Sequence, residues 1–195
     1  GSVMRVAFLI TAIVFAWSAS GTECTVQSEI RDVIGPATVD LVRRASALAD
    51  QEKCASVLLT INTPGGGLDS TRLLVEAILG SSRPFLCLVA PSGGHAGSAG
   101  AIILQACHVS GALRGTNLGA ATPVLMGQEM GEDLRRKILN DTTSWLESLT
   151  RLRGRSDKFG KEIIVDAKAV SADEALKLKA IDFVGETSEE FLNFA

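Results

Sequence analysis

Aromatic and imidazole side chains are scarce in this sequence of 195 residues. Tyrosine is absent, aromatic residues make up 5%, and there are two histidines. Proteins that bind single-stranded nucleic acid stack bases on aromatic side chains, and nucleic-acid-binding domains carry a surplus of positive charge. The formal net charge of this chain is −3. The composition therefore argues against nucleic acid as the main partner.

Patterns that bind metals or phosphates are missing as well. No two cysteines have the C-x-x-C spacing that is typical of zinc sites and redox motifs. Neither glycine-rich turn matches G-x-x-x-x-G-K-[ST], and neither is a G-x-G-x-x-G followed by an acidic residue about 20 residues later. We therefore expect neither a metal nor a cofactor.

The four cysteines leave two possibilities open. Cys24 lies at the start of the first predicted strand and Cys54 just before the second. If these strands are neighbours, an oxidising compartment would permit a disulfide between the two. The alternative is that all four cysteines, including Cys87 and Cys107, are buried free thiols.

The beginning of the chain differs from the rest. Residues 1–3 are typical of a remnant of cloning. A positive charge at Arg5 is followed by an uncharged apolar run over residues 6–17 and then by small residues. This order is typical of a secretory signal, and the run is shorter than the about 20 residues that span a bilayer.

We therefore expect a signal peptide or N-terminal anchor over residues 1–23 and one domain over residues 24–195. The location would be extracytoplasmic, periplasmic or at the cell surface. The alternative is that the apolar run is a buried helix or strand of the domain. If the run is ordered, it should pack on an apolar surface, and a groove beside Ser98 is one candidate.

Strands and helices alternate over the remainder. Predicted strands span 25–29, 55–61, 85–90, 109–113 and 181–184; predicted helices span 36–50, 69–79, 98–106, 132–153 and 188–194, and a capping box at 171–174 opens one more. The continuous apolar run ASVLLTI is typical of a strand covered on both faces. The alternation predicts an α/β fold, a mainly parallel sheet with flanking helices.

Two glycine-rich turns each follow a buried strand and precede a helix. They are NTPGGG at 62–67 and PSGGHAGSAG at 91–100. Ligands of an open parallel sheet bind outside the carboxyl ends of its strands, so both turns should face one crevice. Glycine lets the backbone approach a substrate closely, and free N–H groups can stabilise an oxyanion.

Ser98 is the polar side chain best placed for catalysis, because it follows Gly97 and opens a helix. The structural alternative is an ordinary serine at a helix N-cap. A nucleophilic serine needs a base. His95 lies in the same turn as Ser98, whereas His108 lies at the far end of the helix, about 15 Å away.

A lysine can replace histidine as the base if it loses its proton. In the helix predicted over 132–153, Lys137 flanks the apolar stripe, and the neighbouring arginines cannot be deprotonated. Lys137 is therefore the usable base on that helix. The alternative is a solvated surface lysine.

Three segments resemble a known family. The runs INTPGGGLDSTRLLVEAIL, APSGGHAGSAGAIIL and GTNLGAATPV resemble the ClpP-class membrane serine proteases of the NfeD family, in their N-terminal protease domain. The segments KILNDTTSWLESLTRLRGR and SADEALKLKAIDFV fit its later part. The resemblance covers about residues 25–184 and implies a ClpP/crotonase-like fold.

The resemblance also implies roles for single residues. Ser98 would be the nucleophile and Lys137 the general base of a Ser-Lys dyad. The expected oxyanion-hole donors are the backbone N–H groups of Gly65, Gly66 and Ala99, and the residues expected to bind substrate are Gly67, Leu68 and His95. Three positions depart from the family's pattern: His95 and Gly97 in the second turn, and Lys179, where a helix-ending glycine is expected.

The implied function is a serine endopeptidase that cleaves apolar peptide segments, with membrane-associated proteins as substrates and a stomatin-like protein among them. A homo-oligomer, a dimer or larger, is expected. One alternative is a noncatalytic scaffold of the same fold that binds peptides or a stomatin-like protein. The other is a crotonase-type acyl-CoA enzyme, which would need a basic site for the CoA phosphates.

Overall fold

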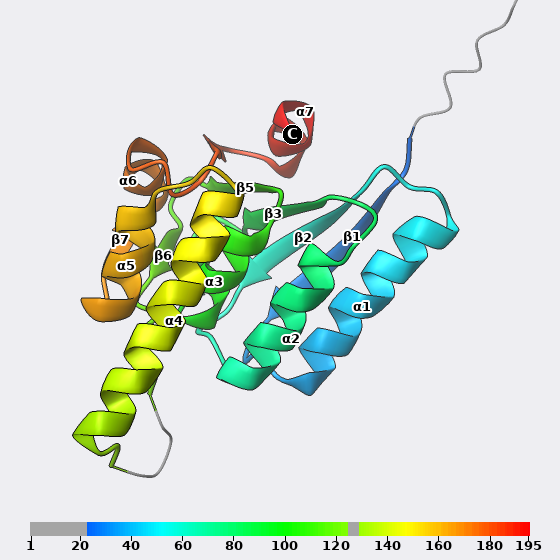
Figure 1. Ribbon diagram of the computed structural model, residues 1–195. Helices are drawn as coiled ribbons and strands as arrows, with labels where there is room; N and C mark the ends of the chain where they lie inside the picture. The colour runs from blue at the N-terminus through cyan, green and yellow to red at the C-terminus, as the bar shows by residue number, and fades with distance from the viewer. Residues whose placement is uncertain (1–22, 125–128) are drawn as a thin grey trace, which may run out of the picture.

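A computed structural model describes residues 23–124 and 129–195 (Figure 1). The signal or anchor predicted over residues 1–23 lies almost wholly outside the described residues. The apolar run over residues 6–17, for which packing on an apolar surface was expected and the groove beside Ser98 was one candidate, lies wholly outside them.

The centre of the molecule is a five-stranded sheet with the order β1-β2-β3-β5-β8, and all four strand pairs are parallel. The strands are β1 (Thr25–Arg31), β2 (Ser56–Asn62), β3 (Phe85–Val89), β5 (Val109–Leu113) and β8 (Phe183–Gly185). All five side chains of β3 are buried, as expected for a central strand covered on both faces. The predicted α/β fold with a mainly parallel sheet is confirmed.

Helices cover both faces of this sheet unequally. They are α1 (Pro36–Gln51), α2 (Leu68–Leu79), α3 (Ala99–Ala106), α4 (Glu132–Leu152), α5 (Asp157–Val165), α6 (Ala172–Lys177) and α7 (Ser188–Phe194). In Figure 1, α1 to α4 lie in front of the sheet and share its main core. The C-terminal α7 packs Phe191 against Leu58, Leu86 and Leu88 on the other face.

A second sheet was not predicted. Its strands β4 (His95–Gly97), β6 (Asn117–Gly119) and β7 (Ala169–Ser171) have three residues each and the order β4-β6-β7. Strands this short show no hydrophobic periodicity. The residues of β4 were therefore assigned to the second glycine-rich turn. Helix α5 was missed as well; a glycine, Gly160, interrupts its pattern and packs against Leu146 and Thr150 of α4.

Two disulfides join segments that lie far apart in the sequence. Cys24, just before β1, is bonded to Cys54, just before β2, across 30 residues. Cys87 on β3 is bonded to Cys107 at the end of α3, across 20 residues. The feasible bridge between Cys24 and Cys54 is confirmed, and the alternative of four free thiols is wrong.

A buried arginine holds the C-terminal end of α3. The Arg155 guanidinium donates to the carbonyl oxygens of Gln105 and Cys107, both at 2.9 Å, and pairs with Asp182 at 2.9 Å. Its side chain is 1% exposed. A cation is stabilising at the C-terminal end of a helix, where carbonyl groups lack partners inside the helix.

Replacing Arg155 by methionine should lower the free energy of unfolding by about 3–5 kcal/mol, because it leaves the Asp182 carboxylate and the α3 carbonyls without their partner. Urea denaturation at neutral pH measures this change. Arg151→Met is the matched control: Arg151 pairs with Asp157 on the surface, where the expected loss is at most about 1 kcal/mol. Equal losses in the two variants would contradict the argument.

Lys179 follows α6 in a left-handed backbone conformation, with φ of 58°. The Ala180 N–H donates to the Ala175 carbonyl and the Lys179 N–H to the Leu176 carbonyl, which closes the helix in the manner of a glycine cap. The backbone therefore keeps the glycine-type turn that the family's pattern predicts, although a lysine occupies it.

Lys179→Gly should stabilise the protein by up to about 1 kcal/mol, because glycine adopts this conformation without the steric cost that other residues carry. The measurement is the midpoint of urea denaturation. Lys177→Gly, in the last turn of α6, serves as the control and should destabilise by about 0.5–1 kcal/mol. A lower urea midpoint for Lys179→Gly than for the wild type would show that the lysine side chain stabilises the turn after α6.

Candidate functional site

A cavity of about 450 Å³ lies outside the carboxyl end of β2, where the two glycine turns meet. Its lining comes from the first glycine turn, α2, the start of α3, the segment after β6 and the start of α4. The lining residues are Val33, Pro64, Gly65, Gly66, Gly67, Leu68, Thr71, Ser98, Ala99, Ile102, Ala121, Thr122, Pro123, Val124, Met130 and Ile138.

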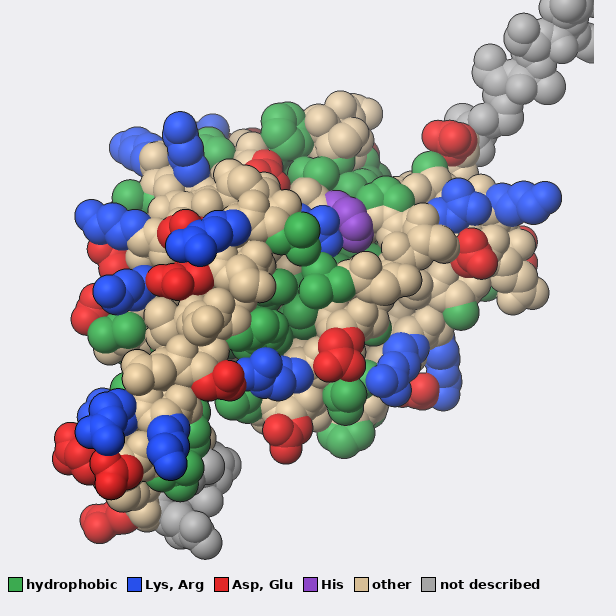
Figure 2. All heavy atoms as spheres, in the orientation of Figure 1, with side chains coloured by type: hydrophobic (Ala, Val, Ile, Leu, Met, Phe, Trp, Pro, Cys, Tyr) green, Lys and Arg blue, Asp and Glu red, His purple; other side chains and the backbone are tan. Residues whose placement is uncertain are grey.

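None of these lining residues is charged. Figure 2 shows apolar side chains in the middle of this face, between charged side chains over α4 and over α2. Such a cavity favours apolar ligands, and it offers no cation to the phosphates of CoA. This disfavours the alternative of an acyl-CoA enzyme.

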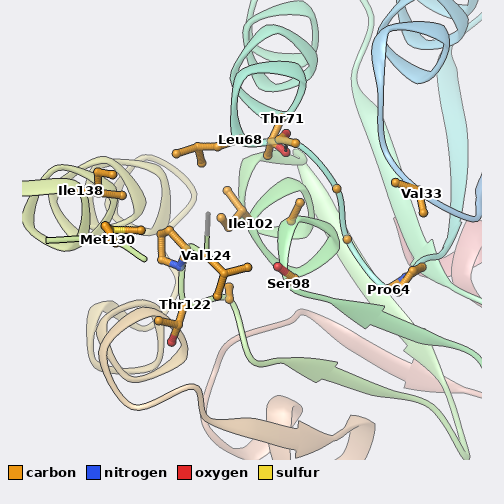
Figure 3. A pocket seen from close by; sticks show the side chains of 16 residues that line it. Val33, Pro64, Leu68, Thr71, Ser98, Ile102, Thr122, Val124, Met130 and Ile138 are labelled. Atoms are coloured by element: carbon orange, nitrogen blue, oxygen red, sulfur yellow. Dashed lines mark hydrogen bonds between the residues drawn. The ribbon is translucent and has the colours of Figure 1, made fainter. Parts of the chain in front are cut away.

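Ser98 opens α3 in a strained conformation, with φ of 51° and ψ of −119°. Backbone outside the common regions costs about 1–3 kcal/mol and is typical of functional sites. The surroundings hold this conformation: the Ser98 N–H donates to the Gly119 carbonyl of β6 at 2.8 Å. The turn from β4 into α3 therefore presents Ser98 to the cavity (Figure 3).

The Ser98 hydroxyl does not cap its helix. Serine at an N-cap position ordinarily accepts a hydrogen bond from the second or third helical N–H. The side chain of Ser98 makes no such bond, whereas Ser156 and Ser171 cap α5 and α6 in the ordinary way. Ser98 is therefore not an ordinary capping serine, which was the structural alternative.

The first glycine turn presses directly against Ser98. A Cβ atom on Gly65 would lie 2.6 Å from the Ser98 Cβ and 3.1 Å from its Oγ, and Gly65 has φ of +116°. A Cβ on Gly66 would lie 2.1 Å from the Ile34 carbonyl oxygen. Any side chain at either position would collide, so glycine is required for this close approach.

Two N–H groups around Ser98 have no acceptor among the described residues. The Gly67 N–H donates to the Ile34 carbonyl, and the Ile34 N–H donates to the Gly65 carbonyl. The Gly66 N–H, which lies between these two hydrogen bonds, has no acceptor among the described residues. Ala99 is the first residue of α3, so its N–H has no partner inside the helix. The Gly65 N–H, by contrast, donates to Thr63 Oγ1 at 3.1 Å.

Thr63 is a structural support of the site that the sequence reasoning missed. It is fully buried, and its hydroxyl donates to the Asp32 carbonyl while it accepts from Gly65. Its backbone N–H donates to His95 and its carbonyl accepts from Gly97. Thr63 thus fastens the first glycine turn to β4, immediately before Ser98.

Lys137 lies in the second turn of α4, one residue before Ile138, which lines the cavity (Figure 3). The Lys137 side chain is exposed and makes no hydrogen bond or ion pair with any described residue. The structure therefore brings the turn that carries Lys137 to the cavity rim, but it forms no hydrogen bond between Lys137 and Ser98.

Neither histidine is placed as a base. His108 accepts a hydrogen bond from the Phe85 N–H at its Nδ1 atom, at 3.0 Å. Burial lowers the pKa of His108, and the nearby Arg153 and Arg155 lower it further. His95 is half-buried in β4 and does not line the cavity, in contrast to Gly67 and Leu68, which do.

Residues 23–124 and 129–195 contain neither a metal-binding cluster nor a membrane-spanning helix. No group of three or more His, Cys, Asp or Glu side chains is arranged to hold a metal ion. No helix in this part combines the length and the apolar composition needed to span a membrane.

No family model matches the chain. The chain is 29% identical over 167 residues to the membrane-bound protease PH1510 of Pyrococcus horikoshii; the match covers 85% of this chain and 38% of that protein. The chain thus spans well under half the length of this relative.

Solved structures agree with this similarity. The serine-to-alanine mutant of the 1510-N membrane-bound stomatin-specific protease is 28% identical, with a TM-score of 0.83, over 88% of this chain and 84% of that one. The lysine-to-alanine mutant, in complex with a substrate peptide, is 26% identical, with a TM-score of 0.82, over 89% and 80%. The family resemblance predicted from the sequence is confirmed: the chain is a homologue of this protease and shares its fold.

Proposed function

We propose that this chain is a serine endopeptidase with a Ser98–Lys137 dyad that cleaves apolar peptide segments. The observation that carries the proposal is the conformation of Ser98: a strained backbone that points a non-capping hydroxyl into an apolar cavity. The similarity to a protease studied as a serine mutant and as a lysine mutant supports both members of the dyad.

In the proposed reaction, neutral Lys137 takes the hydroxyl proton while Ser98 Oγ bonds to the scissile carbonyl carbon. The N–H groups of Gly66 and Ala99 stabilise the oxyanion that forms. Protonated Lys137 then gives its proton to the leaving amine, and the C–N bond breaks. Water, activated by Lys137, releases the acyl group and restores Ser98. The Gly65 N–H is paired with Thr63 and therefore does not donate to the oxyanion. Gly65 contributes instead by letting the turn pack closely against Ser98.

Lys137 has to reach Ser98 for this reaction. Its side chain is long and free of other partners among the described residues. Catalytic hydrogen bonds are often absent in the free enzyme and form with substrate. We expect Nζ and Oγ to come within about 2.6–3.2 Å of each other when a peptide fills the cavity.

The cavity suggests the substrate class. Its walls, including Gly67 and Leu68, are uncharged, so an extended peptide with apolar side chains should bind best. Relatives of this fold are described as membrane-bound and stomatin-specific. We therefore propose a membrane-associated protein segment, with a stomatin-like protein among the candidates, as the substrate, and a homo-oligomeric assembly.

The disulfides support an extracytoplasmic location. Both cysteine pairs are oxidised in the fold, and disulfides persist in the periplasm and outside the cell rather than in the cytosol. This agrees with the signal-like order of the first residues.

A noncatalytic scaffold that binds peptides is the second candidate function. The exposed Lys137, which has no hydrogen bond to Ser98, favours it. Both functions use the same cavity, so only a test of the hydroxyl's reactivity separates them.

Trapping with a serine-reactive phosphonate ester that carries an apolar side chain provides this test. A peptidase should form one covalent adduct per chain, which peptide mapping by mass spectrometry should locate on Ser98. Reaction should be lost in Ser98→Ala. If the intact protein stays unmodified under conditions that label a control serine protease, the scaffold is the better description.

A further inference from the structure

The cavity lies between two helices, α2 and α4, that do not share an extensive interface. Leu68 and Thr71 of α2 form one wall, and Ile138 of α4 lies in another (Figure 3). Helix α2 packs on α1 and α3, and α4 packs on α3 and α5. The width of the cavity therefore depends on what joins α2 to α4 directly.

Arg72 makes such a connection. It follows the cavity residue Thr71 on α2, and its guanidinium donates to the Asp141 carboxylate of α4. The same guanidinium lies over the ring of Trp145, 4.3 Å from the ring centroid. Asp141 and Trp145 are one turn apart, so a single side chain holds two positions on one face of α4.

This contact lies beside the cavity. Asp141 comes three residues after Ile138, which places it on a neighbouring part of the helix surface. The Arg72 side chain is 34% exposed and the Asp141 side chain 72%, so the ion pair alone is weak and gains from its combination with the Trp145 ring. An arginine that combines a carboxylate with an aromatic face cannot be replaced by lysine without loss, because lysine lacks the planar fork.

We infer that Arg72 sets the separation of α2 and α4, and with it the size of the apolar side chain that the cavity accepts. The contact holds the two walls in their narrow arrangement. Without it, α4 can move away from α2, which admits larger side chains and weakens the fit of small ones. This inference rests on the proposed use of the cavity for apolar peptides, but it does not require that the peptide be cleaved.

The test measures peptide binding in the Ser98→Ala background, where no turnover interferes. Two peptides of apolar sequence differ only in one central residue, alanine or phenylalanine, and isothermal titration calorimetry gives Kd for each. Arg72→Ala should shift the ratio of the two Kd values by up to about fivefold in favour of phenylalanine, because the shift cannot exceed the free energy of the lost contact, which is worth roughly that factor. Arg72→Lys should give an intermediate ratio.

A matched control uses the pair of Arg44 and Asp40, which lies within α1. Arg44→Ala removes the same charge and should leave the ratio unchanged. Asp141→Asn should shift the ratio in the same direction as Arg72→Ala, and the double variant should add little to either.

The outcomes separate the two proposals. If Arg72→Ala binds both peptides with the starting ratio, or weakens both equally, the inference is wrong while the proposed function stands. If the wild-type chain neither binds nor cleaves any apolar peptide, the proposed function fails and the inference fails with it.

Discussion

Replacing Ser98 by alanine is expected to abolish peptide cleavage and leave the fold intact. The reason is chemical: without the hydroxyl no acyl-enzyme forms, and what remains is the binding of the peptide and the oxyanion donors. In serine proteases this loss reaches several orders of magnitude in kcat, about 10⁶-fold in the best-studied case. Alanine keeps the same backbone conformation at similar cost, because Ser98 already has positive φ.

Purified wild-type and variant proteins should be compared on an apolar peptide, with circular dichroism and urea denaturation to verify folding. Ser70→Ala supplies a control with the same chemical change, since Ser70 lies in the first turn of α2, near the glycine turn but outside the cavity lining. It should retain nearly full activity. Turnover retained by the Ser98 variant would rule out Ser98 as the nucleophile.

Replacing Lys137 by alanine should lower kcat by several orders of magnitude, because the serine hydroxyl loses its proton acceptor. Lys137→Arg should not rescue the rate, since arginine stays protonated. Arg136→Ala is the matched control on the same helix turn; Arg136 pairs with Asp133 on the surface and should be dispensable. Comparable losses in Lys137→Ala and Arg136→Ala would point to damage to α4 instead of a lost base.

The Lys137 assignment also predicts the direction of the pH dependence. A lysine base works only as the neutral amine, so kcat/KM should rise with pH as the amine loses its proton. A profile that is flat between about pH 5 and pH 10 would contradict a lysine base. The rise should be absent from the residual activity of Lys137→Ala.

The elements that the sequence predicted well are those with long patterns. Helix α1 starts at Pro36, as expected for a proline in the first turn, and β2 and β3 follow continuous apolar runs. The three strands of the small sheet could not be found in this way, because a strand of three residues has no period. Their pairing depends on contacts between segments that are distant in sequence.

Within the site, Ser98 and the two glycine turns could be predicted because small residues and a serine at a strand–helix junction leave a local signal. The importance of Thr63 could not. Its role depends on contacts with Asp32 and His95, which only the folded chain brings together. The bond between Cys87 and Cys107 is of the same kind, since it joins β3 to the end of α3.

The position of Lys137 shows the limit of helix periodicity. The pattern placed it on the flank of the apolar stripe, and the structure leaves its side chain in solvent with Ile138 facing the cavity. Periodicity ranks the faces of a helix, but it does not fix how far that helix lies from the next one. That distance is what the contacts of Arg72 are inferred to set.

The bond between Cys24 and Cys54 has a mechanical consequence. β1 is an edge strand, held to the sheet by hydrogen bonds to β2 alone. A pull on the residues that precede Cys24 would otherwise load these bonds one after another and peel the strand away. With the disulfide just before its first residue, the load passes through covalent bonds to the residues that lead into β2, an interior strand of the sheet. Tension at the N-terminus would thus bypass the hydrogen bonds between β1 and β2 and act on an interior strand of the sheet.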